Sequence, residues 1–117
     1  MFKRIFLSAF VVSSFNASAI TLDDFSTQLV EGDMIVGVAV TPGRVGNNEI
    51  HVTVTTPSGS LSPIENLTMR LTLPGSEVPT ITAAIAELGP NHFVGTLSIL
   101  TPGTWTLEIL IQPDPSS

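Results

Sequence analysis

Short runs in which apolar and polar residues alternate, each closed by a turn rich in proline and glycine, constrain the fold of this chain most. A period of two residues places one side of a strand in a core and the other side in solvent. No run has helical length, which argues against parallel strands joined by helices. The alternating runs cover residues 49–55, 67–73, 80–87, 93–99 and 104–111, and a sixth run at 34–40 is rich in β-branched residues. They predict an all-β fold, an antiparallel immunoglobulin-like β-sandwich of about six to seven strands.

The apolar side of each run supplies the predicted core, and threonine is the usual residue on the other side. In the absence of cysteine, this packing has to stabilise the domain without a disulfide. The residues expected to face inward are Val36, Val38, Val40, Ile50, Val52, Val54, Leu67, Met69, Leu71, Ile81, Ile85, Phe93, Leu97, Trp105, Leu107 and Ile109.

Residues 1–19 have the layout of a secretory signal peptide. Lys3 and Arg4 precede an apolar stretch at 5–15, which is shorter than the roughly 20 residues of a transmembrane helix. Small residues lead up to Ala19, so we expect cleavage after Ala19 and a periplasmic or secreted protein; an uncleaved anchor is the alternative. Export without cysteine favours a bacterial periplasm.

The rest of the chain divides into an N-terminal arm at 20–32, a sandwich domain at 33–112 and a polar tail at 113–117. The arm has no clear period, and one helical turn, an edge strand and a loose arm all remain open for it. The mean hydropathy of +0.43 comes partly from the signal segment. No apolar run in 20–117 approaches the length of a membrane span, so the mature chain is expected to have no transmembrane segment.

Charge excludes one class of partner. Cleavage would leave two arginines, no lysine and ten acidic residues, a formal charge of −8. Binding of nucleic acid depends on lysine and arginine that neutralise phosphates, so we expect no nucleic-acid partner.

Residues that carry catalysis are scarce. The mature chain has no cysteine, lysine or tyrosine, and it has no nucleophile elbow, phosphate-binding loop or zinc-protease motif. A sandwich of this size also offers little room for a large concave pocket. We therefore predict a protein that is not an enzyme and has no catalytic residues.

Two histidines and one methionine are candidate metal ligands. His51 is on the polar side of its run with Glu49 two residues before it, and His92 follows the turn at 89–91. Imidazole suits copper and zinc, and the thioether of Met69 suits Cu(I). The alternative is that both histidines are solvated surface residues and that the methionines fill the core.

Several segments resemble the YtkA-like domain, which also forms the C-terminus of bacterial copper-import membrane proteins of the CopD/YcnJ type. They are 42–54 (PGRVGNNEIHVTV), 57–59 (PSG), the alternating 67–73 and 101–109 (TPGTWTLEI), so that the resemblance covers roughly residues 40–111. It implies a β-sandwich with an accessory role in periplasmic copper or metal handling, copper as ligand and an envelope or membrane protein as partner. The mature N-terminus at Ile20 lacks the histidine with which CopC-like proteins bind Cu(II).

The glycines and asparagines of that resemblance have a physical interpretation as turn residues. Gly43 and Gly46 allow positive φ in a tight loop, and the side chain of Asn47 is expected to bond the backbone and fix the turn. Trp105 is expected to fill the core between the sheets.

Two functions are therefore open. The first is an exported, non-enzymatic module in metal handling, and the second is a metal-free immunoglobulin-like module that binds another envelope protein by strand addition. A carbohydrate-binding module would need exposed aromatic side chains, and the alternation turns Phe93 and Trp105 inward.

Overall fold

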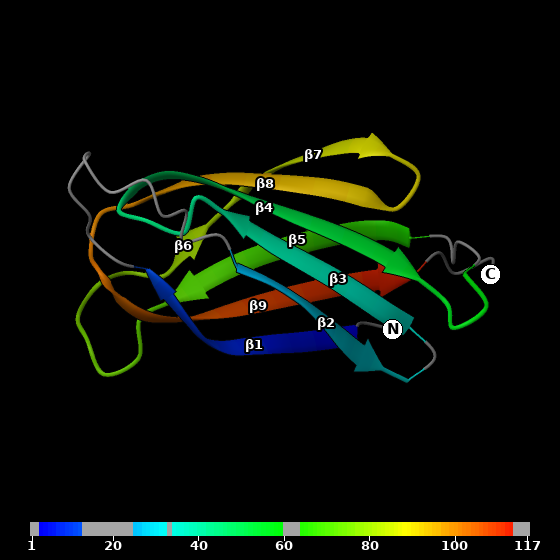
Figure 1. The fold of residues 1–117 in the computed structure, drawn as a ribbon, viewed down its shortest axis with the longest axis horizontal. Coiled ribbons are helices and arrows are strands. Elements are labelled where there is room, and N and C mark those ends of the chain that lie inside the picture. Colours follow the sequence, from blue (N-terminus) through cyan, green and yellow to red (C-terminus); the bar gives the residue numbers. More distant parts are fainter. Residues whose placement is uncertain (1–2, 13–24, 33, 60–63, 114–117) are drawn as a thin grey trace.

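Two antiparallel sheets face each other in the computed structural model of this chain, which describes residues 3–12, 25–32, 34–59 and 64–113 (Figure 1). The strands are β1 (Lys3–Val12), β2 (Phe25–Glu31), β3 (Met34–Thr41), β4 (Gly46–Thr55), β5 (Ile64–Thr72), β6 (Ile81–Thr82), β7 (Ala84–Gly89), β8 (His92–Ile99) and β9 (Gly103–Pro113). No helix occurs among the described residues. The prediction of an all-β antiparallel sandwich is confirmed.

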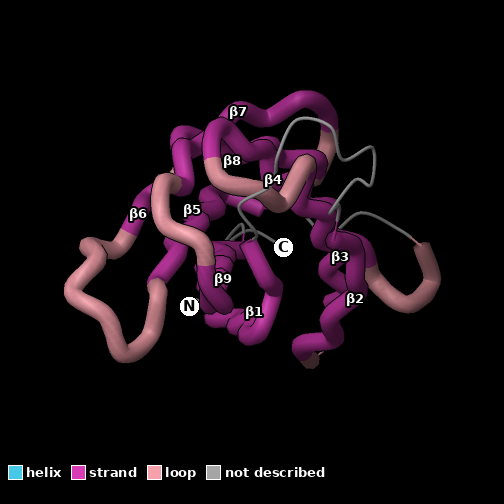
Figure 2. The backbone as a smooth tube through the Cα atoms, turned by 60° about the vertical axis from the view of Figure 1, so that its left-hand side comes forward, coloured by secondary structure: helices cyan, strands magenta, loops and turns pink. Residues whose placement is uncertain are grey.

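One sheet has the strand order β1-β9-β5-β6 and the other has the order β2-β3-β4-β8-β7. Figure 2 shows them as two layers. The run predicted as one strand at 80–87 is divided at Ala83, where the chain passes from the first sheet to the second. The amide of Ala83 donates a hydrogen bond to the carbonyl of Met69 at 3.0 Å, which holds this crossing point against β5.

The described part of the chain has nine strands where the sequence showed six runs, because the run at 80–87 forms two strands and two further segments pair with sheet edges. Residues 25–31 of the arm form β2 and pair with β3, so the edge strand is the alternative that the structure shows for them. Residues 3–12 of the predicted signal segment form β1 and pair with β9. The expected cleavage after Ala19 lies outside the described residues and remains a prediction.

The core lies between the two sheets and follows the alternation. Every residue expected to face inward is buried except Ile81 and Ile85, which are half-buried and pack against the same cluster. Trp105 has no exposed surface, and its indole Nε1 donates a hydrogen bond to the carbonyl of Thr101 at 3.1 Å. This bond satisfies the one polar atom that burial of the ring takes out of water.

The two sheets pack closely against each other at Gly95 of β8. A Cβ atom at this position would lie 2.8 Å from Sδ of Met69 and 3.0 Å from Cβ of Ala83. A glycine here therefore leaves room for the fully buried Met69 side chain from the opposite sheet.

The loop between β3 and β4 is held by Asn48. Its Oδ1 accepts a hydrogen bond from the amide of Gly43 at 2.8 Å. Its Nδ2 donates to the carbonyls of Arg44 (2.7 Å) and Gly46 (3.0 Å). The prediction that Asn47 fixes this turn is wrong by one residue: Asn47 is exposed, and its Oδ1 instead accepts a hydrogen bond from Ser98 Oγ at 2.6 Å.

Candidate functional site

The outer face of the five-stranded sheet carries both histidines of the chain. Ile50 and Val52 are fully buried on the inner face of β4, so His51 between them points outward. In the β4–β8 pairing, His51 is opposite Val94 and Thr53 is opposite His92. The two histidines are therefore diagonal neighbours on one face, close enough for their side chains to meet.

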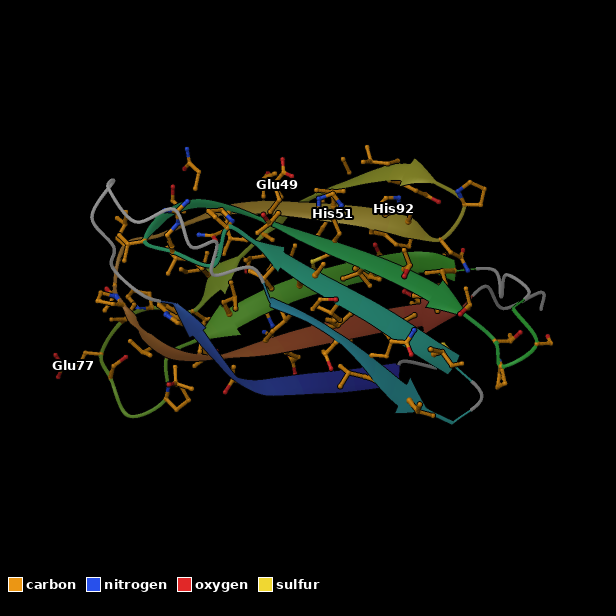
Figure 3. All side chains as sticks on the ribbon, in the orientation of Figure 1. Glu49, His51, Glu77 and His92 are labelled. Atoms are coloured by element: carbon orange, nitrogen blue, oxygen red, sulfur yellow. The ribbon has the colours of Figure 1, made fainter. Side chains whose placement is uncertain are left out.

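The two imidazole rings contact each other through one nitrogen each. Nδ1 of His51 lies 3.3 Å from Nε2 of His92, the ring centroids are 5.5 Å apart, and the ring planes are inclined by 42°. Figure 3 shows both side chains on the same side of the sheet. The structure thus brings together two of the three residues that the sequence offered as metal ligands.

A carboxylate extends this contact on the other side of His51. Oε1 of Glu49 lies 3.1 Å from Nε2 of His51, and the two side chains are 55% and 33% exposed. A proton on Nε2 that is donated to Glu49 leaves Nδ1 as the nitrogen with a free lone pair, aimed at His92. A carboxylate that orients a metal-binding imidazole in this way is a recurrent arrangement in metal sites.

The turn before β8 holds His92 in position. Asn91 has a positive φ of 56°, and its side-chain Nδ2 donates to the carbonyl of Val54 at 3.1 Å. The amide of Val54 in turn donates to the carbonyl of Asn91 at 3.1 Å. This reciprocal pair of bonds fixes the start of β8 against the end of β4, so the next residue, His92, lies within reach of His51.

Met69, the third candidate, is not brought to this pair. It lies on β5 in the opposite sheet and is fully buried, with its sulfur under Gly95. Met34 and Met69 thus follow the alternative interpretation as core residues, since Met34 is buried as well. Among the residues that the structure describes, no three histidine or acidic side chains gather as a metal-binding group. A metal ion held by this pair would take two ligands, His51 and His92, from the described residues.

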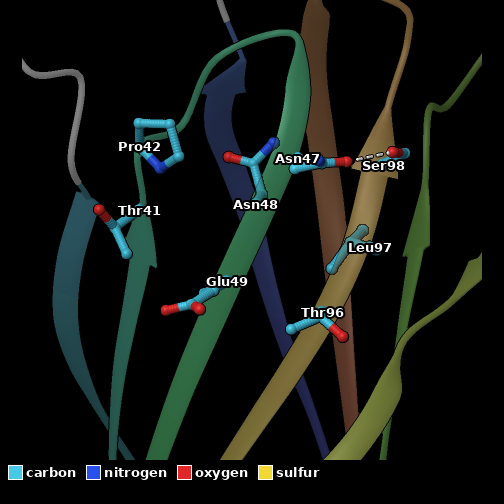
Figure 4. A pocket seen from close by; sticks show the side chains of 8 residues that line it. All are labelled: Thr41, Pro42, Asn47, Asn48, Glu49, Thr96, Leu97 and Ser98. Carbon is cyan, nitrogen blue, oxygen red and sulfur yellow. Dashed lines mark hydrogen bonds between the residues drawn. The ribbon is translucent and has the colours of Figure 1, made fainter.

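A hollow of about 640 Å³ lies beside Glu49 and was not predicted from the sequence (Figure 4). Its lining comes from the ends of β3, β4 and β8 and consists of Thr41, Pro42, Asn47, Asn48, Glu49, Thr96, Leu97 and Ser98. Glu49 thus borders the hollow and also contacts His51. The hollow could not be recognised in the sequence, because it depends on the pairing of strands that lie far apart in the chain.

Within the described ranges, no helix has the length and apolar character needed to cross a membrane. No family model, no curated protein and no solved structure matches this chain.

Proposed function

We propose that this chain is an exported, non-enzymatic β-sandwich module that binds a transition-metal ion through His51 and His92 and serves as an accessory in periplasmic copper or metal handling. The observation that carries the proposal is the 3.3 Å separation of Nδ1 of His51 from Nε2 of His92. Two nitrogens that each lie 2.0–2.1 Å from one tetrahedral metal ion are roughly 3.3 Å apart. The pair therefore has the spacing of two ligands of one ion as well as that of a hydrogen bond.

The type of ligand limits the type of metal. Neutral imidazole suits copper and zinc, whereas calcium and magnesium prefer several oxygen ligands. Glu49 supports the same assignment, because its contact with His51 Nε2 favours the tautomer that has its lone pair on Nδ1. The resemblance to YtkA-like domains points to copper within this class.

Two protein ligands on an open sheet face fit a site that exchanges its metal with another molecule. His51 is one-third exposed, and the remaining coordination positions would face solvent. An accessory that receives and passes on an ion needs such open positions, whereas a structural site is closed by four protein ligands.

The test is a titration of the exported protein, purified without a polyhistidine tag, with Cu(I), Cu(II) and Zn(II) against competing chelators. We expect H51A and H92A each to weaken binding by more than the roughly 10- to 100-fold that loss of an outer-shell partner costs. M69L and E87Q are the matched controls and are expected to bind as the wild type does, because Met69 is buried in the opposite sheet and no hydrogen bond or ion pair among the described residues links Glu87 to either histidine. The absence of binding tighter than micromolar, or wild-type affinity in both histidine variants, would refute the proposal.

A metal-free module that binds another envelope protein is the second candidate. The small number of potential metal ligands favours it, since no group of three histidine or acidic side chains forms within the described part of the chain. Under this alternative the two histidines are surface residues that form a hydrogen bond with each other, and the function lies at a strand edge.

A further inference from the structure

β9 pairs with β5 along one of its edges and with β1 along the other (Figure 1). The β1–β9 pairing is antiparallel and runs from Lys3 opposite Ile111 to Val12 opposite Gly103, with one register shift between Leu7 and Phe10. The segment that covers this edge is thus part of the predicted signal peptide. Removal of residues 1–19 would leave β9 as the edge strand of its sheet.

β9 lacks the features that usually protect an edge strand from further pairing. It is eleven residues long, it contains no lysine, and its one proline stands at its last position, Pro113. Unpaired backbone groups along such an edge are a template for a new strand. Its single charged residue, Glu108, is ion-paired with Arg70 of β5 and so does not repel an incoming chain.

The buried side chains of β9 determine which positions must be apolar in a strand that pairs with its edge. Trp105, Leu107 and Ile109 are fully buried and face the core. In the register of the structure, the residues opposite them are Phe10, Leu7 and Ile5. A strand at this edge therefore needs apolar residues at the positions that face the same core.

Charge favours a basic strand over a second copy of this chain. The exported form would carry a formal charge of −8, so two copies repel each other and a cationic segment is attracted. Lys3 and Arg4 stand opposite Ile111 and Leu110, near the end of β9 where Gln112 Nε2 lies 3.5 Å from Glu65 Oε2.

We infer that the exported domain is a strand acceptor: its β9 edge binds, in antiparallel orientation, an extended basic segment of another envelope protein that has alternating apolar residues. This inference rests on the predicted cleavage and is independent of metal binding, so it can be tested in the presence of a chelator.

The first experiment determines whether cleavage removes β1 and leaves β9 as an edge strand. The full chain is expressed in a Gram-negative host, the protein is recovered from the envelope, and its intact mass is measured. We expect the mass of a chain whose first residue is Ile20. A folded protein that keeps residues 3–12 would show that β1 is a permanent strand and would overturn the inference.

The second experiment tests the acceptor with synthetic peptides added to the exported protein. The probe is the ten-residue peptide of residues 3–12, and binding is followed by calorimetry and by the midpoint of thermal unfolding. We expect binding and a raised midpoint with this peptide, no binding with its I5S/L7S/F10S form, and at least about tenfold weaker binding with its K3E/R4E form. A wild-type peptide that does not bind, or three peptides that bind equally, would overturn the inference.

The third experiment tests the register with disulfide cross-links, which are unambiguous in a chain without cysteine. L110C is expected to cross-link to the R4C peptide, because residues 4 and 110 are opposite each other. T82C on β6 is the control and is expected not to react with that peptide, since β6 pairs with β5. If L110C does not fold, E108C with the F6C peptide tests the same register.

A different occupant gives a different result. Exported L110C that forms disulfide-linked homodimers instead of reacting with the peptide would assign the edge to a second copy and would refute the basic-strand partner. Loss of metal binding in H51A leaves all three experiments unchanged, so the two proposals fail separately.

Discussion

Nδ1 of His51 lies 3.3 Å from Nε2 of His92, although 41 residues separate the two histidines in the chain. The contact results from the pairing of β4 with β8 and from the turn at Asn91, which fixes where β8 begins. Two ring nitrogens that face each other at this distance compete for one proton or share one cation. The chemistry of the site is therefore determined by what lies between them.

E49Q is expected to weaken metal binding while both ligands remain. The carboxylate of Glu49 lies 3.1 Å from Nε2 of His51 and orients that ring, and loss of such a partner typically costs about 10- to 100-fold in affinity. Competition titration against a chelator measures the change, with E87Q as the control. Equal affinities for wild type and E49Q would show that Glu49 is only a surface neighbour.

Metal binding is expected to weaken in acid. Protons and metal ions compete for the same imidazole lone pairs, so the affinity falls as the pH is lowered. We expect at least about tenfold weaker binding at about pH 5 than at about pH 7.5, because only the neutral imidazole binds the metal. A titration series in buffers that do not bind metal provides the measurement. An affinity that stays constant across this range would point to ligands other than imidazole.

Substitution of Asn91 is expected to affect both stability and the histidine pair. N91G loses the side-chain hydrogen bond from Nδ2 to the carbonyl of Val54, but glycine still accepts the positive φ. N91A loses the same side-chain bond and also strains the backbone. We expect N91A to be the less stable, with a total loss of about 1–3 kcal/mol in urea unfolding. We also expect weaker metal binding, since His92 is the next residue. N91A as stable as N91G would mean that φ is not strained there.

G95A is expected to destabilise the sandwich. The added methyl group would lie 2.8 Å from Sδ of Met69, and overpacking of a core typically costs about 1–3 kcal/mol. The double variant G95A/M69A is expected to lose less stability than the sum of the two single variants, because the truncated side chain makes room for the methyl group. Chemical denaturation of the four proteins completes the cycle. Additive losses would place the strain elsewhere.

N48A is expected to be more destabilising than N47A. The buried Asn48 side chain makes three hydrogen bonds to the loop backbone, and a buried group left without a partner costs about 1–3 kcal/mol. Asn47 is exposed and has one side-chain bond, to Ser98. Unfolding midpoints of the two variants give the comparison. A lower unfolding midpoint for N47A than for N48A would show that Asn47 is the residue that fixes the turn.

The strands and the core could be predicted from the sequence because alternation is a local property. Ile50, Val52 and Val54 identify one face of a strand without knowledge of its neighbours. The same alternation, extended two residues toward the N-terminus, places Asn48 on the inner face and Asn47 on the outer face. The identity of the turn-fixing asparagine was therefore available in the pattern, and the error was one of register.

The pairing of strands could not be predicted, and the site depends on it. Glu49 and His51 were recognised as neighbours because they are two residues apart on one strand, whereas the approach of His92 depends on β8 lying next to β4. Met69 shows the converse, since its residue type suits Cu(I) but its position on β5 turns it into the core. Residues 3–12 are ambiguous for a different reason, because a signal peptide and a β-strand can both be short and apolar.

The burial of Trp105 in β9 gives the protein a built-in optical reporter. The chain has one tryptophan and no tyrosine, so its near-ultraviolet absorption and emission come almost entirely from this one indole. The ring has no exposed surface, which shields its fluorescence from quenchers in solution. Trp105 is also opposite Phe10 in the β1–β9 pairing, so the same emission band responds both to global unfolding and to the arrival or loss of a strand at that edge.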